Sequence, residues 1–147
     1  MKIILTVILA ALGWLFCWTM FADAAAIHAR TGATATGIQP RYAAQFQAFV
    51  DDLEAHGVTI KFMGGYRPGR CWQADKHACG MAIDVCQYAR NVVDSRCHLS
   101  RGVVAELAEK HGLFSGGLWC NPDFGHVEAG GSVACGHQWT GREWAGR

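Results

Sequence analysis

Six of the seven cysteines lie between residues 71 and 135, and they constrain the fold of this chain more than any other feature. Cysteines at this frequency are typical of exported proteins, in which they pair as disulfides, and none has the CxxC spacing of a zinc ribbon. We therefore predict an oxidising compartment and three disulfides, with buried free thiols as the alternative. The sequence leaves the pairing open among the six candidates: Cys71, Cys79, Cys86, Cys97, Cys120 and Cys135.

Residues 1–26 have the composition of an export signal. A lysine is followed by an apolar run over residues 3–21 and then by two alanines and an aspartate at 22–24. This order predicts a signal peptide that is cleaved after Ala24 or Ala26. The run is also close to the length that spans a bilayer, so an uncleaved signal anchor is the alternative. We expect a periplasmic or secreted domain, held at the inner membrane only through residues 3–21 if the signal is not cleaved.

The composition favours one packed domain and excludes two classes of protein. Hydrophobic residues make up 51% of the chain and charged residues 17%, which is unlike a disordered protein. The formal net charge of +1 provides no electrostatic field for capturing nucleic acid. A chain of 147 residues has room for one sizeable core. We therefore expect a monomer that binds no nucleic acid.

The periodicity of apolar residues defines where the folded domain begins. Residues 27–39 are small, polar and aperiodic, which predicts a linker before a domain over residues 40–147. Apolar residues then recur at intervals of three and four, which predicts a first helix over residues 41–56. Pro40 fits the first turn of this helix and Gly57 fits the position just after its end.

The remaining predicted elements are short and include one more helix. They are strands over residues 58–63, 80–87, 117–119 and 125–128, and a helix that begins after Ser100 and ends before Gly112. Together these elements predict a small α+β domain.

Asp84 is the most informative residue of the predicted strand over 80–87. Alternation puts Ile83 and Val85 on the core face and Asp84 on the other face. A carboxylate in so apolar a strand is costly unless it is solvated, paired with an arginine or bound to a cation. His77 precedes it by seven residues, and His126 lies in another predicted strand. Two imidazoles, one carboxylate and one open position form the ligand set of a catalytic zinc site.

Three segments carry a resemblance to a known family. Residues 77–84 read HACGMAID and fit the pattern HxxGxAxD, and residues 123–126, DFGH, place a carboxylate three residues before a histidine. Upstream, residues 64–69 read GGYRPG. On these motifs the chain resembles the zinc peptidases that include D-alanyl-D-alanine carboxypeptidases, dipeptidases and L-alanyl-D-glutamate endopeptidases. The extensin-like and Hedgehog-type domains are related to this family.

The resemblance implies a fold and a set of site residues. The fold is a small antiparallel sheet flanked by helices, Hedgehog or D-Ala-D-Ala metallopeptidase-like, here reinforced by disulfides. The family's metal is Zn²⁺, and its ligands correspond to His77, Asp84 and His126. Asp123 corresponds to the catalytic base, and Arg67 to an arginine that contacts the substrate or stabilises the transition state. The alternatives are an Asx-turn role for Asp123 and a surface-turn role for Arg67.

Glu128 competes with Asp123 for the role of base. It follows His126 by two residues on a predicted strand, so both side chains point to the same face. A partner that orients His126 is the other role open to Glu128.

The function expected from this resemblance is that of an exported zinc peptidase. Its substrate would be a peptidoglycan stem peptide, cut by metal-activated water in a carboxypeptidase or an endopeptidase reaction. A catalytically silent zinc-binding module of the same fold, which binds cell-wall material, is the first alternative. A disulfide-stabilised structural domain without metal, in which Asp84 pairs with an arginine, is the second.

Overall fold

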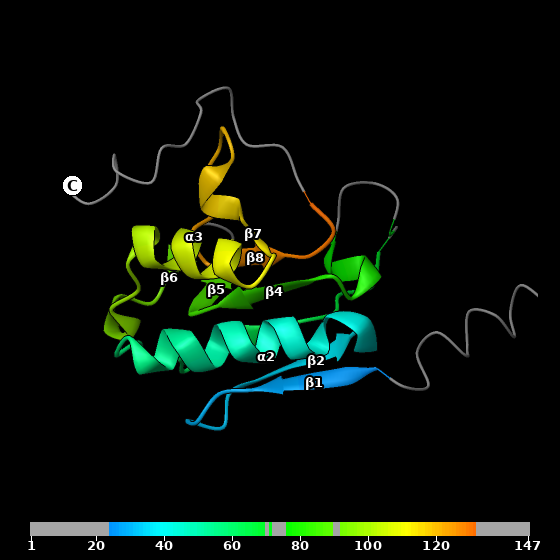
Figure 1. The fold of residues 1–147 in the computed structure, drawn as a ribbon, viewed down its shortest axis with the longest axis horizontal. Coiled ribbons are helices and arrows are strands. Elements are labelled where there is room, and N and C mark those ends of the chain that lie inside the picture. The colour runs from blue at the N-terminus through cyan, green and yellow to red at the C-terminus, as the bar shows by residue number, and fades with distance from the viewer. Residues whose placement is uncertain (1–23, 70, 72–75, 90–91, 132–147) are drawn as a thin grey trace, which may run out of the picture.

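A four-stranded antiparallel sheet forms the centre of the fold (Figure 1). The computed structural model describes residues 24–69, 71, 76–89 and 92–131. The strand order is β3-β4-β8-β7, with β3 at Met63–Gly64, β4 at Ala82–Val85, β8 at His126–Glu128 and β7 at Phe114–Ser115. The helices are α2, Pro40–Ala55, and α3, Arg101–Lys110. These elements confirm the predicted α+β class.

Two small hairpins and three short 3-10 helices complete the described structure. The hairpins are β1–β2, Ala25–His28 with Thr34–Ile38, and β5–β6, Gln87–Ala89 with Val92–Val93. The 3-10 helices are η1, His77–Cys79, η2, Ser95–Cys97, and η3, Gly116–Leu118.

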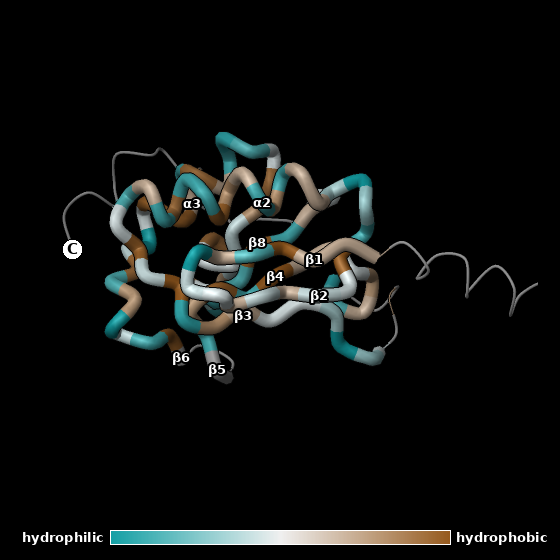
Figure 2. Tube along the Cα trace, turned by 90° about the horizontal axis from the view of Figure 1, so that it is seen from below, coloured by the Kyte–Doolittle hydropathy of each residue, from teal (hydrophilic) through white to brown (hydrophobic). Residues whose placement is uncertain are grey.

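The core lies between the sheet and the two helices. Ile83, Val85 and Val127 are fully buried and belong to one hydrophobic cluster with both helices. The helices contribute Phe46, Phe49, Val50 and Leu53 from α2 and Val104, Leu107 and Ala108 from α3. In Figure 2 the brown, hydrophobic stretches include parts of α3, β4 and β8, whereas several connecting loops are teal. Because side chains alternate along a strand, the face of the sheet opposite this core is left for Asp84 and His126.

Both helices begin and end close to their predicted positions. Pro40 occupies the first turn of α2, and Gly57 follows its end with a φ of 87°. Ser100 is the N-cap of α3, although its side chain makes no capping hydrogen bond to the described helix, and Gly112 follows that helix with a φ of 67°. Glycine suits both positions because it adopts the left-handed conformation without steric penalty.

Three of the predicted strands are wrong in extent or type. The strand predicted over 80–87 is limited to Ala82–Val85, because Gly80 and Cys86 have φ values of 65° and 58°, and Gln87 begins β5. In the segment 58–63, Val58 and Ile60 are buried, but only Met63 belongs to a strand. Instead of a strand ladder, the backbone of this segment makes separate hydrogen bonds. Thr59 N donates to Cys97 O at 3.4 Å, and Phe62 O accepts from Cys86 N at 2.9 Å.

The predicted strand over 117–119 is replaced by η3, and the strand β7 lies just before it. The side chain of Ser115 accepts a hydrogen bond from Gly117 N at 3.2 Å, which starts the 3-10 turn. Glycine suits the first position of this turn, because a Cβ on Gly116 would lie 2.8 Å from Asp123 O. An alternation pattern read from so few residues does not detect the turn.

The prediction of a linker over residues 27–39 is also wrong, because this segment contains most of the β1–β2 hairpin. Ile27, Ala35 and Ile38 are each at most 1% exposed and belong to the core cluster. Arg30 fixes the turn to α2, where the buried carboxylate of Glu54 accepts from its backbone N at 3.0 Å and its Nε at 3.2 Å. Ala29, which is 7% exposed, also belongs to the core cluster, and four buried apolar residues among small polar ones are too few to produce a periodic signal. The described fold therefore begins before Pro40.

Replacing Ile27 with alanine tests this correction. Since the side chain is 1% exposed, we expect the substitution to lower the free energy of unfolding by about 2–5 kcal/mol. The neighbouring His28→Ala, at an exposed position of the same strand, should change it by no more than about 0.5 kcal/mol. Equal effects of the two substitutions in a denaturant titration would show that the hairpin is not packed on the core.

Two of the predicted disulfides lie in the described part of the chain. They join Cys71 to Cys79 and Cys86 to Cys97. Cys120 is disulfide-bonded as well, whereas Cys135 lies outside the described residues. The first pair ties Cys71 to the last residue of η1, and the second ties Cys86, just after β4, to the last residue of η2.

Within the described ranges, no helix is long and apolar enough to cross a bilayer. Residues 1–23, most of the predicted signal segment, lie outside those ranges, so the signal peptide or anchor stays a prediction.

Candidate metal centre

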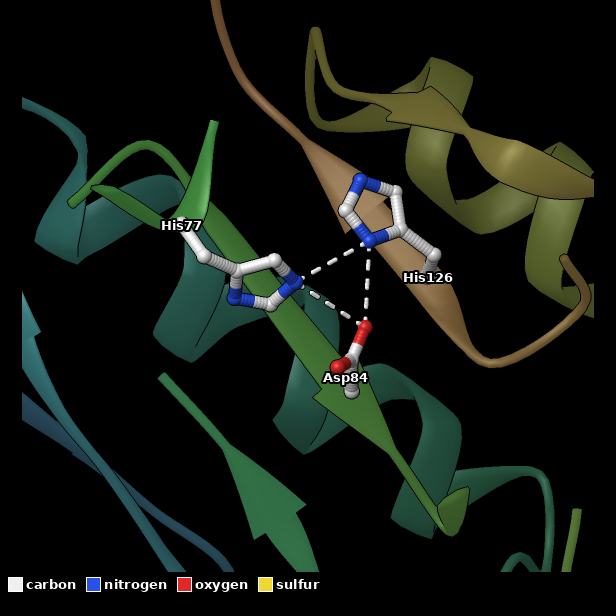
Figure 3. Close-up of side chains that lie close together, drawn as sticks. All are labelled: His77, Asp84 and His126. Carbon is white, nitrogen blue, oxygen red and sulfur yellow. Dashed lines mark hydrogen bonds and ion pairs between the residues drawn. The ribbon is translucent and has the colours of Figure 1, made fainter. Parts of the chain in front are cut away.

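His77, Asp84 and His126 meet on the face of the sheet opposite the helices (Figure 3). Asp84 Oδ1 lies 3.1 Å from His77 Nε2 and 3.0 Å from His126 Nδ1. The two imidazole nitrogens are 3.1 Å apart. All three residues are buried, with exposures of 1%, 7% and 5% in chain order. Such a group could hold a metal ion.

Strand pairing and one turn bring these three side chains together. Asp84 in β4 and His126 in β8 are directly opposite in the antiparallel register, so their side chains share one face. His77 comes from η1, which ends at Gly80 in the left-handed conformation with a φ of 65°. Gly80 N donates to His77 O at 2.9 Å, which turns the chain back into β4.

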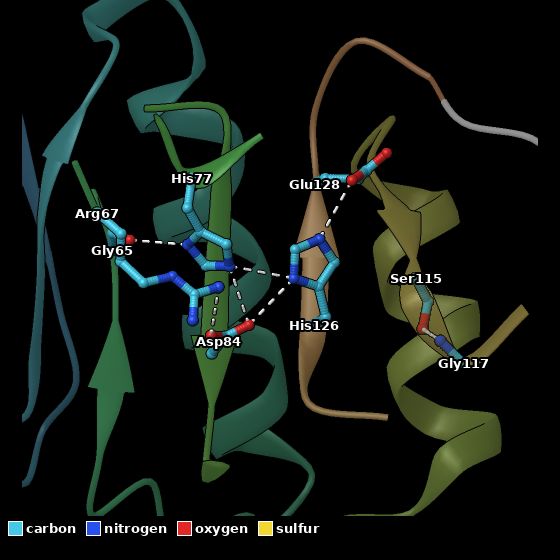
Figure 4. A network of polar contacts seen from close by, with 8 residues as sticks. All are labelled: Gly65, Arg67, His77, Asp84, Ser115, Gly117, His126 and Glu128. Atoms are coloured by element: carbon cyan, nitrogen blue, oxygen red, sulfur yellow. Dashed lines mark hydrogen bonds and ion pairs between the residues drawn. The ribbon is translucent and has the colours of Figure 1, made fainter. Parts of the chain in front are cut away.

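Hydrogen bonds outside the centre fix which nitrogen of each imidazole faces inward (Figure 4). His77 Nδ1 lies 2.7 Å from the carbonyl oxygen of Gly65, which can only accept, so Nδ1 carries the proton. His126 Nε2 lies 3.1 Å from Glu128 Oε2 and donates to this carboxylate. The lone pairs of His77 Nε2 and His126 Nδ1 therefore point toward Asp84. Outer partners of this kind orient the histidine ligands of metal sites.

Three hydrogen-bond acceptors, each with a lone pair, thus converge in a buried space. Two neutral imidazole nitrogens and a carboxylate oxygen repel one another unless a cation lies among them. A proton on His126 Nδ1 or a metal ion supplies that positive charge. The predicted ligand set is therefore brought together in an arrangement suited to a cation.

The pKa values of two groups reflect this arrangement. Burial raises the pKa of Asp84, but its interactions with His126 and His77 outweigh burial and hold that pKa well below its usual range. Burial lowers the pKa of His126, whereas its hydrogen bonds to the carboxylates of Asp84 and Glu128 outweigh burial and raise that pKa to about 9. The site favours an ionised Asp84 beside a positive charge at His126 Nδ1.

Arg67 lies at the edge of the centre. Its Nη2 is 3.4 Å from Asp84 Oδ2, the oxygen on the other side of the carboxylate from the histidines, and its side chain is 60% exposed. The pairing of Asp84 with an arginine, which the sequence left open, therefore exists beside the histidine contacts. The guanidinium of Arg67 is largely exposed, which leaves it free to turn toward a bound molecule.

Two further buried carboxylates lie close to His126 in the chain, and each keeps one oxygen atom without a partner among the described residues. Asp123 precedes β8 and is 7% exposed; its backbone N donates to Gly116 O at 2.9 Å, and its backbone O accepts from His126 N at 3.2 Å. Asp123 Oδ1 and Glu128 Oε1 are buried and make no hydrogen bond within the described ranges. Buried polar atoms are seldom left unpaired, so both atoms are candidates for contact with water or a ligand.

Gly65 and Trp119 also contribute to the centre, and the sequence did not predict a role for either residue. Gly65 contributes a backbone carbonyl, which no side-chain motif can reveal, although the residue lies in the GGYR segment. Trp119 packs on His126 with ring centroids 4.8 Å apart, and residue type alone does not distinguish such an aromatic from one in the core.

Comparisons with protein-family models, curated proteins and solved structures find no match to this chain. The chemistry of the site therefore rests on its own residues.

Proposed function

We propose that this protein is an exported zinc-dependent peptidase that hydrolyses peptidoglycan stem peptides. The observation that carries the proposal is the convergence of His77 Nε2, Asp84 Oδ1 and His126 Nδ1 within 3.0–3.1 Å of one another. The substrate class comes from the resemblance of the HxxGxAxD, DxxH and GYR motifs to the zinc peptidases named above. The fold proposed is the Hedgehog or D-Ala-D-Ala metallopeptidase-like one, which the sheet and two helices support in outline.

Zinc fits the donor atoms of this centre. Zinc binds histidine nitrogen and carboxylate oxygen at about 2.0–2.2 Å, and tetrahedral geometry then separates neighbouring ligand atoms by about 3.3 Å. The three separations of 3.0–3.1 Å are only slightly shorter. Two histidines and a carboxylate leave one tetrahedral position open, as catalytic zinc sites do. When bound, zinc would lower the pKa of water toward about 7 and polarise a substrate carbonyl.

Asp123 is the residue proposed to accept a proton from the attacking water. The buried carboxylates of Asp123 and Glu128 each keep one oxygen without a hydrogen-bond partner among the described residues, but the other oxygen of Glu128, Oε2, is engaged with His126 Nε2. Glu128 is therefore assigned to orienting His126 and not to the base.

Arg67 is proposed to bind negative charge on the substrate. Its guanidinium lies beside Asp84 and is largely exposed, so it can reach a substrate carboxylate or the oxygen that becomes negative during hydrolysis.

The cysteines support the proposed location outside the cytoplasm. Two disulfides join Cys71 to Cys79 and Cys86 to Cys97, and Cys120 is disulfide-bonded too. Disulfides of this kind form and persist in oxidising compartments such as the periplasm or the extracellular space.

Incubation with defined stem peptides tests the proposal. The oxidised protein, loaded with zinc, is mixed with peptides that contain an L-Ala-D-Glu or a D-Ala-D-Ala bond, and the products are identified by mass spectrometry. We expect fragments from at least one peptide, loss of this activity with a chelator and its return with added zinc. Tight zinc binding without any fragment would favour the catalytically silent binding module.

The affinity for zinc should depend on pH because a proton and the metal compete for His126. The pKa of His126 is raised to about 9, so its ring binds a proton at all pH values below this. We therefore expect the zinc affinity to fall by about tenfold for each pH unit below 9 until other groups titrate. Competition with a chromophoric chelator between about pH 6 and pH 8 measures this dependence. The same affinity at both ends of that interval would contradict the assignment of His126 as a ligand.

A further inference from the structure

We propose that the β1–β2 hairpin supports the metal centre and that Gln39, the residue after β2, is a positioning residue for His77. This inference rests on the proposed metal site and concerns residues that the metal does not touch. Residues that position the three ligands would then include Gln39 and the β1–β2 hairpin, close to the predicted export signal.

Gln39 holds the turn that carries His77. Its side-chain Nε2 donates to Cys79 O at 2.6 Å, and its backbone N donates to Gly80 O at 2.9 Å. Both acceptors lie at the end of η1, within three residues of His77. The side chain is itself restrained, because Gln39 Oε1 accepts from Arg41 Nε at 2.7 Å. Gln39 therefore fixes the position of η1 relative to the start of α2.

The same hairpin holds the outer partner of His77. The carbonyl of Gly65 accepts from His77 Nδ1, and Tyr66 N, the next residue, donates to Thr36 O in β2 at 2.8 Å. The backbone of Thr36 occupies the space that a Cβ on Gly65 would need. The chain that orients the imidazole is thus packed directly against β2.

Close backbone packing makes this support stiff. The carbonyl of Gly37 lies where a Cβ on Gly80 would be, and Tyr66 occupies the corresponding space at Gly37. Glycines at these positions let β2 approach η1 and the Gly65 segment at once. A displacement of β2 would therefore move both the backbone of His77 and the acceptor of its Nδ1 proton. The position of Nε2 in the centre follows from these two restraints.

Cobalt binding by the oxidised protein tests the role of Gln39. The variants are Gln39→Ala, which removes the amide, and Gln39→Glu, which keeps the size and the acceptor for Arg41 but cannot donate to Cys79 O. Gln47→Ala is the matched control, because Gln47 Nε2 donates to His28 O at 2.8 Å and so joins α2 to the other strand of the hairpin. Thermal unfolding of each variant is measured beside its cobalt affinity and visible absorption spectrum.

We expect both Gln39 variants to lose about tenfold in cobalt affinity and to show an altered cobalt spectrum, as loss of an outer partner of a ligand does. Gln47→Ala should keep the wild-type affinity and spectrum even where its stability falls. Wild-type cobalt binding by folded Gln39→Glu would overturn the inference while leaving the metal centre intact. Failure of the wild-type protein to bind cobalt or zinc would instead overturn the metal centre, and the inference with it.

Discussion

Replacing Asp123 with asparagine is expected to lower the rate of stem-peptide hydrolysis by about 10²–10⁴-fold while zinc remains bound. Asparagine has the size of aspartate but cannot accept the proton of the attacking water. Asp123 is not among the three converging ligands, and its backbone hydrogen bonds to Gly116 and His126 do not depend on the carboxylate. Steady-state hydrolysis and zinc content are measured on the same preparation.

Asp51→Asn is the control for this substitution. Asp51 is an exposed residue of α2, and the same change there should leave both hydrolysis and zinc content unchanged. Full activity of Asp123→Asn would assign the base to another group, of which Glu128 is the nearest candidate. Loss of zinc together with activity would give Asp123 a structural role.

Replacing Asp84 with asparagine should have a comparably large effect, here on metal binding. Asp84 contributes the one negative ligand of the centre, and the amide of asparagine is a far weaker ligand for zinc. We expect the zinc affinity to fall by more than the roughly 10–100-fold that loss of an outer partner causes. In the metal-free protein the pKa of His126 should also fall, because the carboxylate of Asp84 contributes to raising it. Chelator competition measures the affinity, and NMR titration measures the pKa.

Asp52→Asn is the matched control for Asp84→Asn. Asp52 is a carboxylate on α2 that accepts from Lys110 Nζ at 2.6 Å and contacts His111 Nε2 at 2.8 Å, so this variant also removes a charge beside a histidine. Its zinc affinity should equal that of the wild type. Equal affinities of the Asp84 and Asp52 variants would show that Asp84 is not a ligand.

The sequence predicted those parts of the fold that depend on local pattern. Helix α2 shows its apolar period and its terminal glycine, and α3 lies between Ser100 and Gly112 as expected. Asp84 stands out in the sequence because a charge interrupts an apolar strand. Its pairing with His126 is set by the β4–β8 register, which brings together residues 42 positions apart. The motifs suggest that pairing, but neither strand alone contains the information that sets the register.

The parts that the sequence did not predict depend on contacts between distant segments. The β1–β2 hairpin is stabilised by four buried apolar residues and by Glu54 of α2, so its own residues show little periodicity. Gly65 acts through its backbone carbonyl, which accepts a hydrogen bond from His77 Nδ1. Gln39 acts through a hydrogen bond to the carbonyl of Cys79, forty residues further along the chain. The pairing of Cys71 with Cys79 and of Cys86 with Cys97 likewise follows from the folded chain and not from cysteine spacing.

The metal content of the oxidised protein, purified without a chelator, shows whether His77, Asp84 and His126 form a zinc site. Wild type and His77→Ala are analysed side by side by elemental mass spectrometry after their folding has been checked by circular dichroism. We expect one zinc per chain in the wild type and none in the variant. Folded wild-type protein that contains no zinc and takes up none when zinc is added would contradict this zinc site, as would equal zinc in both proteins.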